Sequence, residues 1–100
     1  MRMMMIVQCD TEAFNAAVKD GSAGAKMQRI LEAQKPEAAY FTEIDGVRSA
    51  VLVVELASAS QIPSFAEPWF LTFNAKLQMH PVMTAADLGA AGLEALGKAW

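Results

Sequence analysis

The dipeptide Asp45-Gly46 is the feature that most restricts how this chain can fold. It separates two runs rich in β-branched and aromatic residues, 37–45 and 47–56. Glycine accepts the positive φ of a type I′ turn, so the dipeptide predicts a two-residue β-hairpin. The register then places an acid opposite a base and a hydroxyl opposite a hydroxyl. Each such pair stabilises a hairpin by roughly 0.2–1 kcal/mol, and a register shift of one residue would lose both pairs. The predicted cross-strand pairs are Ile44–Val47, Glu43–Arg48, Thr42–Ser49 and Phe41–Ala50.

Two helical regions and two further strands are expected around this hairpin. The apolar run at 3–8 predicts a buried strand, and residues 10–35 predict either one kinked helix or two helices divided near Gly21. Apolar spacing from Ile62 to Phe73 predicts a helix that Pro68 kinks or interrupts. Alternation at 75–83 predicts a last strand, and residues 84–99 a C-terminal helix. The order β-α-β-β-α-β is that of an α+β, ferredoxin-like fold with a four-stranded antiparallel sheet.

The two strands that this fold places in the centre of the sheet show no polar alternation. Residues 3–7 and 50–54 are apolar throughout, whereas an antiparallel sheet with one solvated face alternates apolar and polar residues. The two long helices cover one face, and the C-terminal helix offers mainly alanine and glycine for the other. We therefore expect a second copy of the chain to cover the open sheet face in a two-fold homodimer.

Composition narrows the class of protein. One hundred residues, 54% of them hydrophobic, suit a single domain over residues 1–100. The net charge of -3 argues against nucleic acid as a partner. The apolar runs are too short for a membrane span or a signal peptide, which predicts a cytoplasmic protein with no membrane partner. With one cysteine and one histidine, neither an internal disulfide nor a metal site is expected, and no motif predicts a cofactor.

Two segments carry a resemblance to known proteins. The stretches KPEAAYFTEIDGVRSAVLVVEL and SQIPSFAEPWFLTFNAKLQMHPVMTAADL resemble the dimeric α/β-barrel superfamily, and within it a group of uncharacterised bacterial proteins of about this length. The resemblance implies that two ferredoxin-like subunits pack their sheets face to face; it implies no activity. Some proteins of the group are called pantothenate synthetases. That label does not fit here, because enzymes with that activity are far longer and use a paired-histidine motif, whereas this chain has one histidine.

Four residues are candidates for a ligand site. His80 is the candidate general acid or base of a pocket between sheet and helix, or else a partly solvated histidine on an edge strand. Trp69 is either an aromatic wall for a planar ligand or a core residue on the helical stripe. Asn74 is either a helix C-cap or a polar pocket group, and Tyr40 is a further pocket candidate. Haem-degrading members of the superfamily use an Asn, a Trp and a His, but Asn74, Trp69 and His80 lie too close together in the chain to match them.

Three other side chains with reactive groups are interpreted as structural. Glu43 and Arg48 are expected to form a surface cross-strand ion pair. Cys9 follows a buried strand and is expected to be an inert small residue, since nothing near it in sequence lowers its pKa.

Two functions are compatible with these features. The first is a homodimer that binds a small apolar or aromatic ligand without catalysis. The alternative is a cofactor-free oxygenase or isomerase of the dimeric α/β-barrel type, which rests on resemblance. A cavity of about 300 Å³ or more lined by both His80 and Trp69 would favour the enzyme.

Overall fold

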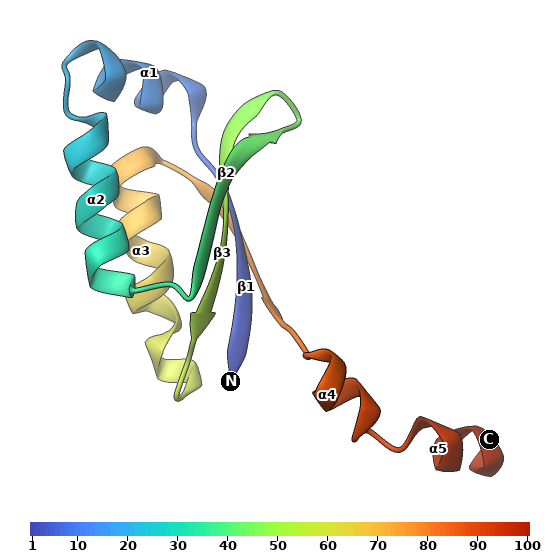
Figure 1. The fold of residues 1–100 in the computed structure, drawn as a ribbon. Coiled ribbons are helices and arrows are strands. Elements are labelled where there is room, and N and C mark those ends of the chain that lie inside the picture. Colours follow the sequence, from blue (N-terminus) through green and yellow to red (C-terminus); the bar gives the residue numbers. More distant parts are fainter.

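The computed structural model describes residues 1–100 and is built around one four-stranded antiparallel sheet (Figure 1). Strands β1 (Arg2–Gln8) and β3 (Val47–Glu55) are central, and β2 (Ala38–Ile44) and β4 (Lys76–Pro81) form the edges, in the order β2-β3-β1-β4. Both central strands are the ones without alternation. The predicted α+β, ferredoxin-like fold is confirmed.

The β2–β3 hairpin has the predicted register at every pair from Phe41–Ala50 to Ile44–Val47. Asp45 and Gly46 have φ values of 55° and 79°, the positive values that a type I′ turn needs. The ion pair between Glu43 and Arg48 is not formed. The Glu43 carboxylate accepts the Gly46 N–H at 2.8 Å instead, and Arg48 donates to Asn15 of the helix layer.

Three helices cover one face of the sheet (Figure 1). The region 10–35 forms two helices, α1 (Thr11–Lys19) and α2 (Ala23–Gln34), because Gly21 adopts a φ of 82° between them. The Asp10 carboxylate caps α1 by accepting the Ala13 N–H at 3.0 Å. A 3₁₀ turn, η1 (Ala59–Gln61), leads into α3 (Ile62–Phe73), which continues through Pro68.

The core lies between these helices and the sheet. Its largest fully buried side chains are Trp69, Phe73, Met5 and Leu52. The Trp69 indole N–H donates to Gln34 Oε1 at 3.1 Å, and Gln34 Nε2 donates to the Phe65 carbonyl at 2.8 Å. Gln34 is the only polar side chain buried between α2 and α3, and both its amide oxygen and its amide nitrogen form a hydrogen bond.

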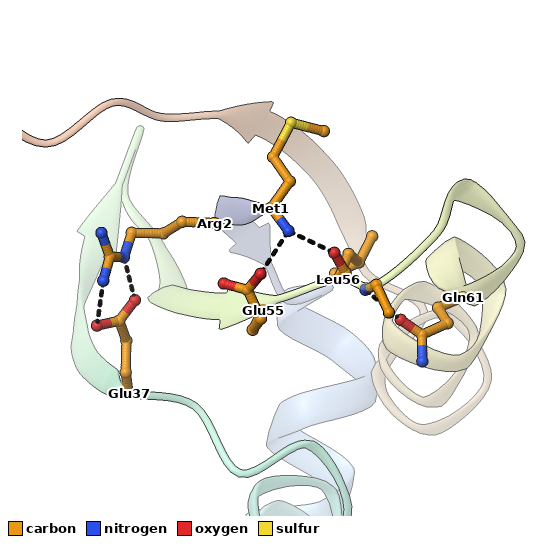
Figure 2. Close-up of polar contacts among 7 residues, drawn as sticks. Met1, Arg2, Glu37, Glu55, Leu56 and Gln61 are labelled. Carbon is orange, nitrogen blue, oxygen red and sulfur yellow. Dashed lines mark hydrogen bonds and ion pairs between the residues drawn. The ribbon is translucent and has the colours of Figure 1, made fainter. Parts of the chain in front are cut away.

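Polar contacts fasten the N-terminus to the neighbouring strands (Figure 2). The terminal ammonium contacts the Glu55 carboxylate and donates to the Leu56 carbonyl at 2.6 Å. Arg2 pairs with Glu37 at the start of β2. Exposed ion pairs of this kind contribute about 0–1 kcal/mol each, so they align strand ends more than they stabilise the fold.

The C-terminal tail (residues 83–100) leaves the sheet after β4 and extends away from it on the side opposite the helices (Figure 1). The helix expected at 84–99 is present as two short helices, α4 (Ala85–Gly89) and α5 (Leu93–Ala99), separated at Gly92 by a φ of 76°. Every residue from 85 to 100 is exposed, and the molecule measures 59 × 28 × 19 Å. The tail therefore covers none of the open face. No helix of the structure has the length and apolar character needed to cross a membrane.

Candidate functional site

A pocket of about 290 Å³ lies between the β2–β3 hairpin and the helices α1 and α2. We call it the helix-side pocket. Its walls are aromatic and aliphatic because three elements each contribute one large apolar side chain on the core side of the sheet. The lining residues are Cys9, Phe14, Met27, Phe41, Thr42, Arg48, Ser49 and Ala50.

Arg48 is the one permanently charged group in this lining. Its guanidinium lies 4.8 Å from the ring centroid of Phe14, and it donates to Asn15 Oδ1 at 2.7 Å. The Phe14 ring in turn stacks on Phe73 with centroids 4.9 Å apart. The cation–π contact and the hydrogen bond hold the guanidinium against the pocket wall, where it can orient an anionic or carbonyl-bearing ligand.

Cys9 is the other ionisable group of the pocket. The side chain is buried, and desolvation raises the pKa of its thiol, an effect that the nearby Arg48 charge only partly opposes. The thiol therefore stays protonated at neutral pH and is a weak nucleophile. One fixed cation and one protonated thiol make a lining suited to binding a molecule rather than to moving its protons.

A second, polar hollow of about 330 Å³ lies at the end of the sheet where β1 finishes and β4 begins. Asn74 lines it and also caps α3, with a φ of 47°. Both interpretations offered for Asn74 thus describe the same position. The other lining residues are Gln8, Cys9, Asp10, Thr11, Asp45, Val47 and Lys76. No group of three or more His, Cys, Asp or Glu side chains is arranged to hold a metal ion.

The structure does not bring the four predicted site residues together. Trp69 is fully buried on the helix side of the sheet, while His80 is exposed and pairs with Met4 on the open face, where its Nε2 lies 3.0 Å from Gln78 Oε1. Of the two interpretations of His80, the structure matches the solvated histidine on an edge strand and not the pocket between sheet and helix, because β4 turns Leu77 and Met79 to the core and His80 away from it. Tyr40, 68% exposed, also lies on the open face.

Trp69 and His80 therefore share no cavity, and the condition that would favour an enzyme is not met. Roles for His80, Tyr40, Trp69 and Asn74 in ligand binding stay predictions. His80 and Tyr40 would serve a molecule held at the open face, and Asn74 one held in the polar hollow.

The residues that line the helix-side pocket were not among the four predicted site residues. One signal was available. The hairpin register places Phe41 opposite Ala50, and Arg48, two residues from Ala50, points to the same face. Arg48 is a cation and Phe41 belongs to an edge strand, and both lie on the core side of the sheet. Such a pair indicates a gap in the core that a ligand can occupy.

No family model and no curated protein matches the chain. Among solved structures, the chain is similar to 5-chloro-2-hydroxyhydroquinone dehydrochlorinase (TftG) from Burkholderia phenoliruptrix AC1100, in its complex with 2,5-dihydroxybenzoquinone. The TM-score is 0.61 at 16% sequence identity, over 86% of this chain and 97% of that one. At this identity the similarity shows that the two chains share a fold.

Proposed function

We propose that this protein is a cytoplasmic homodimer that binds a small aromatic molecule in the helix-side pocket of each subunit. The observation that carries the proposal is the pocket itself. Ligand sites span about 300–1,000 Å³, and the pocket, at about 290 Å³, lies just below the lower end of that range. It accommodates a ligand of one ring.

The lining favours a planar molecule with an oxygen substituent. Phe41 offers a ring face or edge, and Phe14 offers a ring edge, since Phe73 and Arg48 lie over its ring. Met27 offers a polarizable thioether, and Arg48 offers a charge-assisted donor. The fold neighbour TftG was solved with 2,5-dihydroxybenzoquinone, a planar ring that carries oxygens. That compound is a reasonable probe for this chain.

Binding is a better proposal than catalysis because of the protonation states in the pocket. An isomerase or oxygenase that lacks a cofactor needs a group that removes a proton from its substrate. Burial raises the pKa of the Cys9 thiol, so at neutral pH it does not serve as that group. The Arg48 guanidinium is a hydrogen-bond donor without an acceptor atom, so it does not take up a proton from a substrate either.

Isothermal titration with 2,5-dihydroxybenzoquinone tests the ligand proposal. We expect saturable binding that Arg48→Met weakens by about tenfold or more, because a hydrogen bond to a charged group contributes about 1.5–3 kcal/mol. Ala50→Val, which adds two methyl groups at the pocket floor, should weaken binding too.

Two matched controls make the titration specific. Arg29→Met removes an exposed guanidinium from α2, and Ala39→Val enlarges a core-side alanine of β2 that does not line the pocket. Both should bind the probe as the unmodified protein does. Absence of saturable binding, or equal loss in the pocket variants and their controls, would contradict the proposal.

The homodimer rests on the open sheet face. Its centre consists of Met4, Ile6, Val51 and Val53, each half-buried with no helix over it. Packing this face against its copy removes a contiguous apolar surface from water, which is the main favourable term in association.

A further inference from the structure

The C-terminal tail is apolar, helical and packed against nothing. Its large hydrophobic side chains, Met83, Leu88, Leu93, Leu96 and Trp100, are all exposed, Trp100 to 99%. The last backbone hydrogen bond from this end of the chain to the sheet is that of Val82 N–H to the Arg2 carbonyl. From there on, the hydrogen bonds of the tail remain within the tail.

The tail nevertheless has the pattern of a helical segment that docks. Leu93, Leu96 and Trp100 recur at i, i+3 and i+7, which places the C-cap residue Trp100 in line with the Leu93 and Leu96 face of α5. Glu94 and Lys98 form an ion pair at 3.3 Å on another face. Helix α4 begins with a capping box in which Thr84 and Asp87 exchange hydrogen bonds at 2.9 and 3.1 Å.

Helices of five and seven residues do not persist in water by themselves, because isolated helices shorter than about 12–15 residues are marginal. A segment with good caps and an apolar stripe therefore needs a surface to pack on.

The direction in which the tail leaves the sheet indicates whether it packs on its own subunit or on a second copy. The tail leaves on the side of the open face and runs away from its own sheet (Figure 1). A second copy packed on that face occupies the same side. The tail of each subunit is therefore directed toward the other subunit, not toward its own helices.

We propose that the C-terminal tail crosses to the second copy and packs the Leu93, Leu96 and Trp100 face of α5 against it. The inference rests on the proposed homodimer and extends its interface beyond the open face. In the two-fold assembly both tails do this, so each subunit is held by its partner's residues 83–100.

Substitutions in the full chain test the proposal through the dimer dissociation constant. Leu96→Lys places a charge in the docked face of α5 and should weaken the dimer by about tenfold or more. Leu71→Lys is the matched control, since Leu71 is 82% exposed on α3, which covers the side of the sheet opposite the open face (Figure 1). Sedimentation equilibrium should give the control the dissociation constant of the unmodified protein.

Trp100 reports where the tail lies. The difference in emission between the unmodified protein and Trp100→Phe isolates Trp100 from the buried Trp69. We expect the Trp100 emission to be blue-shifted at concentrations that give dimer and to move to the red as dilution separates the subunits.

Three results would overturn the proposal. If the full chain is a dimer and Leu96→Lys has the same dissociation constant as Leu71→Lys, the tail does not contribute and the dimer stands. If the Trp100 emission is blue-shifted in the monomer, the tail folds back on its own subunit. If the full chain is a monomer at every concentration, the homodimer and the tail contact fail together.

Discussion

The pair Trp69 and Gln34 shows how a single buried contact organises the helix layer. Trp69 has no exposed surface, and its indole N–H has one acceptor, Gln34 Oε1. Gln34 is 7% exposed and also satisfies the Phe65 carbonyl. Removing the amide would leave the Trp69 indole N–H without its acceptor, and an unsatisfied buried polar group costs more than its hydrogen bond contributes.

We expect Gln34→Leu to lower the free energy of unfolding by about 1–3 kcal/mol, since the shape is nearly kept and the two hydrogen bonds are lost. Urea denaturation followed by fluorescence measures the change. Gln28→Leu, at an exposed position of the same helix, is the control and should change little. Equal stability of the two variants would mean that the amide has no structural role.

Residue pattern predicts the position of some candidates and not of others. Trp69 follows the apolar stripe of its helix, which predicts burial, and it is buried. The alternation that turns Leu77 and Met79 to the core already implies that His80 faces away, so a pocket under the helices was inconsistent with it. The helix-side pocket itself depends on where α1 and α2 pass over Ala50, which no local pattern specifies.

The β2–β3 hairpin is the element that local chemistry determines most completely. Its register follows from the turn dipeptide, and every pair from Phe41–Ala50 to Ile44–Val47 is confirmed. The side-chain contacts of Arg48 were not predictable from the register. Arg48 contacts Phe14 and Asn15 instead of Glu43, because α1 lies over that end of the strand. Tertiary packing determines which partner a long side chain takes.

We expect Gly46→Ala to lower the free energy of unfolding by about 1–2 kcal/mol, because its φ of 79° disfavours a Cβ. A Cβ at Gly46 would meet no atom within 4 Å, so the effect isolates backbone strain. Gly24→Ala, in α2 and equally free of contacts, should instead stabilise the protein by up to about 1 kcal/mol. Thermal denaturation of the pair tests this; a Gly46→Ala protein as stable as Gly24→Ala would contradict the turn assignment.

Helix boundaries were predicted only in part. Gly21 was identified as the break in the region 10–35, but one kinked helix and two helices remained open, since a glycine with positive φ and a glycine inside a bent helix look alike in sequence. The tail shows the same limit. Gly89, Gly92 and Gly97 weaken a helix at 84–99, and the structure divides it at Gly92.

At the scale of the molecule, the sheet has one face covered by α1, α2 and α3 and one face without a helix (Figure 1). The ferredoxin-like order predicted that the helices lie on one face, and the apolar central strands predicted that the other face is apolar as well. The sequence did not predict that the tail would extend away from the sheet, because a local pattern does not specify whether a terminal helix packs on its own subunit or on another. What the fold leaves uncovered is the apolar centre of the open face and the apolar stripe of the tail.

A charged residue introduced in the middle of the open face tests whether that face is a dimer interface or is exposed to solvent. Ile6→Lys should give a folded monomer, since Ile6 lies on the side of β1 away from the core. Val18→Lys adds the same charge at a position 51% exposed on α1 and should leave the assembly unchanged. Circular dichroism confirms that both variants fold before their masses are compared.

The mass of the full chain in solution tests the central claim most directly. Sedimentation at micromolar concentration should give twice the 10.8 kDa of one chain, and Ile6→Lys should give the mass of one chain under the same conditions. A single-chain mass for the unmodified protein, or an unchanged double mass for Ile6→Lys, would contradict an assembly built on the open face.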